Sequence, residues 1–272
     1  MVKKVGPAGD NGKKIHGISP VITTIILSAT LLVILAIASF AAANLLELQV
    51  ASADFEQAKT NMLLLDDVIQ EVALRRKSGG YVEFNQRSGG INIITTMETL
   101  KITDQFDATL YESPPLVIFV YRGGSKVAGA DSRLKGCDVR YVPYVFNITN
   151  RTDSISYLRI ETGNGLQIKL DYNRVRVANS GLIIVNEKKV NVTEITFIRL
   201  ITGTISGKGT ETITVNVQNF DATTFAKEYP TNNLTINVKV GSNEDYLKLI
   251  SSHEVEATIV LFTEIVIKIS IE

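Results

Sequence analysis

The 272-residue sequence has no tryptophan, one cysteine (Cys137) and two histidines, and its formal net charge is zero. A single cysteine cannot form an intramolecular disulfide, which excludes a small disulfide-stabilised secreted scaffold. Balanced charge argues against nucleic acid as a partner, because phosphate binding needs a basic excess. With so few histidine and cysteine ligands, neither a zinc site nor any other cofactor is expected.

Charge is also missing from one long stretch, since no Asp, Glu, Lys or Arg occurs between Ile18 and Leu46. About 20 apolar residues are enough to span a bilayer. Four lysines precede the stretch, namely Lys3, Lys4, Lys13 and Lys14, opposed only by Asp10. By the positive-inside rule the N-terminus stays cytoplasmic and the rest of the chain is exported.

Proline and glycine are absent from Val21 to Ser78, so the pattern predicts one long helix over residues 18–78. Residues 18–46 form its membrane or filament-core part, and an amphipathic helix follows. Its apolar positions recur at steps of three and four: Leu45, Leu48, Ala51, Phe55, Ala58, Met62, Leu65, Ile69 and Val72. We expect the helix to stop at Gly79–Gly80 and the β region to cover part of this apolar face.

After Gly80 the periodicity changes to alternation, which predicts strands. The expected strands are Tyr81–Phe84, Ile91–Ile94, Leu116–Tyr121, Val139–Phe146, Tyr157–Glu161, Leu166–Tyr172, Gly181–Val185, Ile195–Ile201, Thr212–Val217, Leu234–Val240 and a last strand over 254–271. In that last strand the odd-numbered residues are expected to form one apolar face, with Val260, Phe262 and Val266 as exceptions. The fold class is therefore α+β, with an antiparallel, sandwich-like β-rich head over residues 79–272, as one enlarged sandwich or two small ones.

Residues typical of helix caps and turns predict two short helices and one hairpin turn within the β region. Asp221 and Asn243 are suitable N-caps, so a short helix is expected after each. The glycine-rich stretch from Gly203 to Gly209 has the wrong spacing for a phosphate-binding loop, and we interpret it as a hairpin turn between Ile195–Ile201 and Thr212–Val217.

The remaining candidate sites are four N-glycosylation sequons at Asn147, Asn150, Asn191 and Asn233, all on the side expected to be outside. No constellation of nucleophile, base and orienting carboxylate is apparent, and no G-x-S-x-G motif occurs. The chain is therefore not expected to be an enzyme.

The N-terminal junction resembles a known signal. An ordinary secretory signal has a shorter apolar run and a small-residue cleavage site after it, whereas Ala41-Ala42-Ala43 here leads into more helix. The sequence Lys13-Lys14-Ile15-His16-Gly17-Ile18-Ser19-Pro20 resembles the class III signal of archaeal type IV pilins. Position 22 is Ile where many bacterial pilins carry Glu.

The resemblance implies that a prepilin peptidase removes the leader, residues 1–17, by cutting between Gly17 and Ile18. The mature chain would pass from the membrane into a surface filament, as a major or minor pilin serving adhesion or attachment. Its partners would be copies of itself or related pilins, an assembly platform and an ATPase. In the filament core we expect Val21, Ile25, Leu32, Leu35 and Phe40.

Two alternatives stay open. The apolar stretch could be a plain single-pass anchor that is neither cleaved nor polymerised. The chain could also be a membrane-anchored extracellular binding module that does not form filaments.

Overall fold

The computed structural model describes residues 20–136, 144–146, 154–163, 165–185, 187–206, 212–231, 233–250 and 255–272. The chain divides after Glu47 into two units. The second unit, which we call the head, runs from Leu48 to Glu272 and contains the rest of the helix and every described strand.

One helix, α1 (Pro20–Leu74), confirms the long helix expected from the sequence, with no break between Leu46 and Asp54. Its buried residues are Ala51, Phe55, Ala58, Met62, Leu65, Asp66, Ile69, Val72 and Ala73. Every apolar position expected from Ala51 onward is therefore buried, because steps of three and four keep these side chains on one face. Leu63 is partly buried against the same core.

The end of α1 differs from the expectation. The helix stops at Leu74, and Gly79 and Gly80 already belong to strand β1 (Gly79–Asn85). Lys77 takes the left-handed backbone conformation, with a φ of 60°. A Cβ on Gly80 would come within 2.6 Å of Val68 Cγ1, so this glycine is explained by the close approach of β1 to α1 rather than by helix capping.

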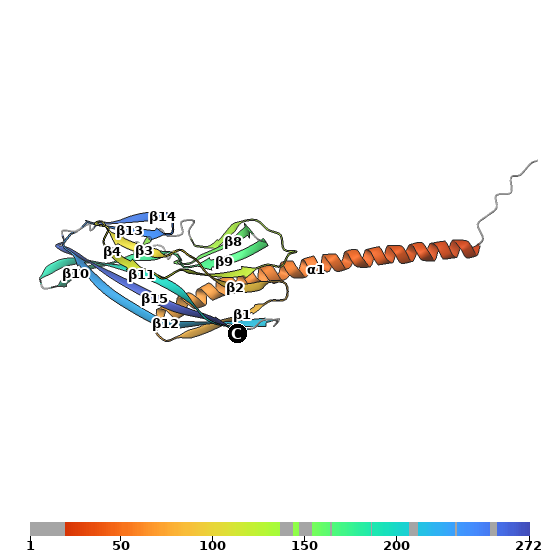
Figure 1. Ribbon diagram of the computed structural model, residues 1–272, viewed down its shortest axis with the longest axis horizontal. Helices are drawn as coiled ribbons and strands as arrows, with labels where there is room; N and C mark the ends of the chain where they lie inside the picture. The colour runs from red at the N-terminus through yellow and green to blue at the C-terminus, as the bar shows by residue number, and fades with distance from the viewer. Residues whose placement is uncertain are drawn as a thin grey trace, which may run out of the picture. The chain divides into compact units, whose positions relative to one another are not determined.

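Fifteen strands are found within the described residues, and they form three sheets (Figure 1). The six-stranded sheet has the order β1-β12-β15-β11-β10-β7, with β12 at Thr212–Tyr229, β15 at Ala257–Ile271, β11 at Lys188–Ile205, β10 at Val175–Val185 and β7 at Tyr144–Phe146. The five-stranded sheet has the order β2 (Gly90–Thr95), β5 (Val117–Arg122), β9 (Gly165–Asp171), β8 (Tyr157–Gly163) and β6 (Ser132–Lys135). The four-stranded sheet has the order β14 (Asn243–Ile250), β13 (Asn233–Val240), β3 (Leu100–Asp104) and β4 (Thr109–Glu112).

The described residues of the head form two hydrophobic cores that share the six-stranded sheet. In β11, Ile195 and Phe197 belong to one core, while Ile198 and Leu200 belong to the other. Successive strand side chains point to opposite faces, so the sheet is covered on both sides. The core that contains the buried face of α1 also includes β1, β5, β8 and β9, and the other includes β3 and β13. The head is therefore neither one enlarged sandwich nor two separate small ones, because its two cores lie on opposite faces of one shared sheet.

The same arrangement corrects the expectation for the last strand. The odd-numbered residues Ile267, Ile269 and Ile271 of β15 are buried beside α1, as expected. Val260 and Phe262 are not exceptions, because they are buried in the second core on the opposite face. The first half of strand β15 therefore buries its even-numbered side chains in one core, and its second half buries its odd-numbered side chains in the other.

Other expectations about the strands were wrong. Asp221 lies at a bulge inside β12, and Asn243 begins β14, so neither residue starts a helix. Asp and Asn suit turns and bulges as well as caps, because their side chains bond to nearby backbone; here Asp221 Oδ1 accepts from Ala222 N at 2.8 Å. Strands β11 and β12 are not hairpin partners, since β15 lies between them.

The head is dominated by antiparallel pairing, which confirms the α+β class expected from the sequence. Among the described strands two pairs are parallel, β11 with β15 and β10 with β7. Parallel neighbours need a long connection rather than a tight turn. Strand β15 pairs in parallel with β11 and antiparallel with β12, so it separates the two strands that were expected to form a hairpin.

Candidate functional site

The first candidate site is the apolar segment of α1, residues 20–46. Every residue from Pro20 to Gln49 is exposed. The five residues expected in a filament core, Val21, Ile25, Leu32, Leu35 and Phe40, expose between 58% and 72% of their surface. So much exposed aliphatic surface is unfavourable in water, and the segment requires an apolar environment.

Three hydroxyl groups within this segment are already satisfied by the helix. Thr24 Oγ1 donates to the Val21 carbonyl at 2.9 Å, Ser28 Oγ donates to the Thr24 carbonyl at 2.8 Å, and Thr30 Oγ1 donates to the Ile26 carbonyl at 2.8 Å. A hydroxyl bonded within its own helix can enter a region without water at little cost. The segment is therefore suited to an apolar phase despite its polar residues.

By length and composition α1 can cross a membrane, and its most apolar 18-residue window has no buried residue. A helix that is apolar all round belongs in a bilayer or among other helices. Both environments bury the same side chains, and each fully buried Leu or Ile contributes about 1.5–3 kcal/mol.

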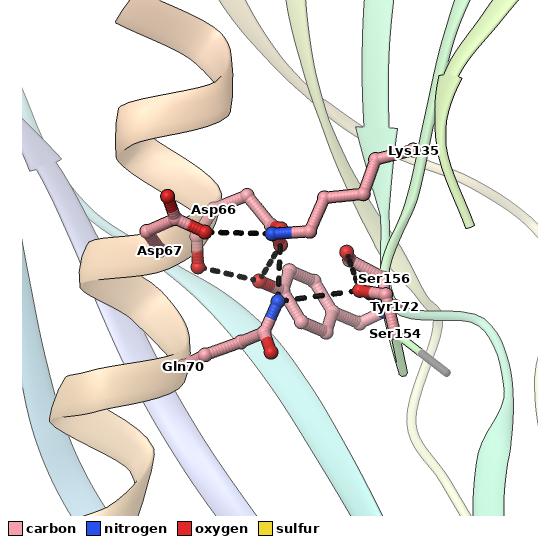
Figure 2. A network of polar contacts seen from close by, with 7 residues as sticks. All are labelled: Asp66, Asp67, Gln70, Lys135, Ser154, Ser156 and Tyr172. Atoms are coloured by element: carbon pink, nitrogen blue, oxygen red, sulfur yellow. Dashed lines mark hydrogen bonds and ion pairs between the residues drawn. The ribbon is translucent and has the colours of Figure 1, made fainter. Parts of the chain in front are cut away.

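The second candidate site is a polar network that attaches α1 to the strands of the head (Figure 2). At its centre is Asp66, which has no exposed surface. Lys135 Nζ lies 2.5 Å from Asp66 Oδ2 and 2.6 Å from Asp67 Oδ1. The Tyr172 hydroxyl donates to Asp66 Oδ1, and Gln70 Nε2 donates to Asp66 Oδ2 at 2.8 Å. One buried carboxylate thus receives three partners, which offset the cost of burying its charge.

The network continues onto the segment before β8. Gln70 Nε2 also lies 3.3 Å from Ser154 Oγ, which is 2.5 Å from Ser156 Oγ. Polar atoms from α1, β6 and the residues around β8 and β9 therefore meet at one place. A network of this kind fixes the rotation of a helix against a sheet, because only one rotation brings all partners into reach.

This environment shifts two pKa values. Burial, and then the charge of Asp66, raises the pKa of the Tyr172 hydroxyl well above its ordinary value. Burial acts to lower the pKa of Lys135, but hydrogen bonds and charges from Asp66 and Asp67 outweigh it and hold the pKa above its ordinary value. Both groups thus hold their protons to a higher pH in the folded head than in the unfolded chain.

These shifts predict a loss of head stability at alkaline pH. The unfolded chain loses the Tyr172 proton near pH 10 while the folded chain keeps it, so stability is full below about pH 10 and falls as pH rises above it. Tyr172→Phe should make the fall shallower by about 1.4 kcal/mol per pH unit. Urea denaturation at a series of pH values measures both slopes, and equal slopes in the two proteins would contradict the prediction.

A second charged cluster lies on β8 and β9. Arg159 pairs with both Glu161 and Asp171, and Lys169 Nζ lies 2.6 Å from Glu161 Oε2. Burial acts to raise the pKa of Glu161, but hydrogen bonds from Lys169 and Arg159 hold it at about 2. Arg159 and Glu161 line an open surface groove of about 460 Å³ together with Asp131, Ser132, Arg133, Tyr157 and Ile160. These charges neutralise one another, so the cluster serves as a cross-strand brace.

The other residues singled out in the sequence lie apart from these clusters. Lys13, Lys14, Gly17, Ile18, Cys137, Asn147 and Asn150 lie outside the described residues. Asn233 is exposed at the start of β13 and remains a glycosylation candidate. Asn191 is only 4% exposed within β11, and this burial argues against a glycan there, because a glycan needs an exposed amide.

Sequence reasoning missed the network around Asp66. Asp66 falls between the apolar positions of the helical pattern, where a solvent-exposed residue is expected, and neither Lys135 nor Tyr172 stood out. The sequence position of Asp66 could have indicated its burial, because Asp66 directly follows the buried Leu65 and lies four residues after the buried Met62, on the same side of the helix.

Within the part of the chain that the structure describes, no group of three or more His, Cys, Asp or Glu side chains is placed to hold a metal ion. Relatives do not supply an activity either: the chain matches no protein-family model, no curated protein and no solved structure.

Proposed function

We propose that this chain is a structural subunit of an archaeal type IV pilus-like surface filament, assembled through the apolar segment of α1. The observation that carries the proposal is the exposure of residues 20–49 along a helix that continues unbroken to Leu74. Packing many such helices side by side buries this surface collectively. The head would then face outward and serve adhesion or surface attachment.

Two features favour a filament over a plain membrane anchor. The Gly17-Ile18-Ser19-Pro20 junction resembles a site where the cut leaves the apolar helix at the new N-terminus. Small residues also recur along the segment and allow helices to approach closely: Ser28, Ala29, Ala36, Ala38, Ser39, Ala41, Ala42 and Ala43. A plain anchor surrounded by lipid requires neither feature.

The network around Asp66 suits a subunit that bears load. A force applied along α1 reaches the strands through Asp66 and Lys135 as well as through the apolar contacts of Met62 and Leu65. The partners in this proposal are copies of the same chain or related pilins, a prepilin peptidase, an assembly platform and an ATPase. Enzymatic activity is no part of it.

Processing provides the direct test. We expect surface protein to begin at Ile18, because the lysines remain cytoplasmic while the apolar segment is kept for assembly. N-terminal sequencing or mass spectrometry of shed surface material measures this start, and electron microscopy of the same sample should show filaments. Gly17→Trp should leave the uncut precursor in the membrane.

Other results would assign a different role. A mature chain that starts near Asn44 would indicate an ordinary signal peptide. An uncut, membrane-bound chain without filaments would favour the plain anchor or the anchored binding module.

A further inference from the structure

The hairpin between β10 and β11 ends in an unusual run of aliphatic side chains. We call residues 182–185 and 187–189 the hairpin tip. Leu182, Ile183, Ile184 and Val185 are all exposed, Ile184 by 75% and the others by 39–44%. Lys188 and Lys189 are exposed opposite them, since Val185 pairs with Lys188 and Ile184 with Lys189.

The described neighbouring strands do not extend over the outer part of this tip. Pairing of β11 with β15 begins at Val190, preceded by one backbone hydrogen bond from Glu256 N to the Lys189 carbonyl at 2.9 Å, and the described pairing of β10 with β7 ends at Ala178. A bulge between Asn179 and Gly181, with a φ of 103° at Gly181, precedes the aliphatic run. Among the described residues, the end of the hairpin is thus a two-stranded ribbon.

Both faces of this ribbon carry aliphatic side chains from β10, and each also carries one lysine from β11, since Val185 pairs with Lys188 and Ile184 with Lys189. Side chains alternate along a strand, so Leu182 and Ile184 point to one face and Ile183 and Val185 to the other. A groove on a protein covers one face of a strand pair, whereas a lipid phase surrounds both at once. Aliphatic side chains on two faces therefore fit lipid better than a protein groove.

We propose that the hairpin tip inserts into an anionic lipid surface. The four aliphatic side chains enter the boundary between headgroups and acyl chains. Lys188 and Lys189 reach the phosphates with their ammonium groups while their stems stay in the apolar layer. Glu187 is the one opposing charge on the tip, so its cationic character is retained.

The topology brings a further apolar side chain, that of Phe106, to the same end of the head, through contacts of Tyr229 and Asp104. Tyr229, the last residue of β12, pairs with Thr258 at the start of β15, beside the start of β11. The Tyr229 hydroxyl lies 3.2 Å from Asp104 Oδ2, where β3 ends. The turn after Asp104 carries Phe106, which is 75% exposed. An exposed aromatic ring at this end is typical of side chains that settle at a membrane interface.

The absence of tryptophan permits a sharp test. In full-length Ile184→Trp protein, reconstituted in vesicles through α1, the only indole is at the tip. Acceptor vesicles of brominated phosphatidylglycerol should shift its emission to the blue and quench it, and brominated phosphatidylcholine should do so less. Phe220→Trp is the matched control, because Phe220 is 62% exposed on β12 and its indole should remain unquenched.

Capture of vesicles gives a second readout. Proteoliposomes carrying the otherwise unchanged chain should tether anionic acceptor vesicles, and Ile184→Asp should reduce capture roughly tenfold, since an aliphatic contact is replaced by a charge that phosphate repels. Lys188→Gln with Lys189→Gln should remove the preference for anionic lipid.

The proposal is overturned if the indole emission of the Ile184→Trp protein does not change with lipid, or if Ile184→Asp captures vesicles as well as the unchanged chain. Chemical crosslinking between heads is the comparison for a protein partner. If Ile184→Asp abolishes crosslinks between two heads but leaves vesicle capture unchanged, the tip binds a second copy of the chain instead of lipid. None of these measurements requires filaments, so the inference stands apart from the proposed function.

Discussion

Replacing Leu35 with glutamate is expected to abolish filaments while leaving the head folded. Leu35 lies in the middle of the apolar segment and is exposed in the single chain. In a bundle of such helices it would meet neighbouring side chains with no water to solvate an ion. Burying an unpaired carboxylate costs several kcal/mol, and the cost is repeated at every subunit.

The same substitution should not prevent membrane insertion. One charged residue at the centre of a transmembrane helix costs about 2.5–3.5 kcal/mol on insertion scales, and the remaining side chains of the segment are uncharged. Electron microscopy should therefore show no filaments while membrane fractions still contain the mature chain. Leu35→Ile, which keeps the volume and the apolar character, should give filaments as the unchanged chain does.

The second half of this expectation concerns the head. Residues 46–272 include the buried face of α1 and both hydrophobic cores, so this fragment should fold as a soluble protein with cooperative unfolding. Normal filaments from Leu35→Glu would show that the apolar segment is not the polymer core. The plain anchor or the anchored binding module would then replace the proposed filament.

The sequence predicted α1 well because one physical rule governs it. Steps of three and four place Phe55, Met62 and Leu65 on one face, and no proline or glycine interrupts the helix. The chain carries this information locally, within a few residues of each position. The exposed apolar segment was predictable for the same reason, since a run without charge needs no tertiary context to be recognised.

The strands were harder because their partners are distant in sequence. Alternation identified most of the strands, including β8, β9 and β13, but missed β3, β4 and β6, and β14 was taken for a helix. Long strands such as β11 and β15 contact a different core in each half, so an alternation count with a single buried face misassigned Val260 and Phe262. Which face of a strand is buried depends on the other sheets that pack against it, and the local sequence pattern carries no information about that packing.

The polar network shows the same limit most clearly. Asp66, Lys135 and Tyr172 come from three separate parts of the chain. Each residue alone suits a solvated surface or an ordinary core. Only the packing of α1 against β6 and β9 brings a carboxylate, an ammonium and a phenol within bonding distance, so this part of the site could not be predicted.

Substituting Lys135 with methionine is expected to destabilise the head by about 2–4 kcal/mol, because Asp66 then stays buried without its cation. For a protein of this size such a loss lowers the melting temperature by roughly 4–16 °C. Denaturation of the fragment 46–272 in urea measures the free energy of unfolding. Arg75→Met is the matched control, since Arg75 pairs with Glu71 at 3.4 Å on the surface and its loss should cost under about 1 kcal/mol.

A double variant separates the loss of a pair from the burial of an unpaired charge. Asp66→Asn combined with Lys135→Met removes the buried charge together with its partner, while an amide at position 66 can still accept from the Tyr172 hydroxyl. The double variant should therefore be more stable than Lys135→Met alone, because the cost comes mainly from the carboxylate left behind. If the double variant is less stable than Lys135→Met, the carboxylate itself holds α1 through Tyr172 and Gln70, and Lys135 is a secondary partner. If Lys135→Met costs no more than Arg75→Met, water reaches Asp66, and the apolar contacts of Met62, Leu65 and Ile69 alone attach the helix to the head.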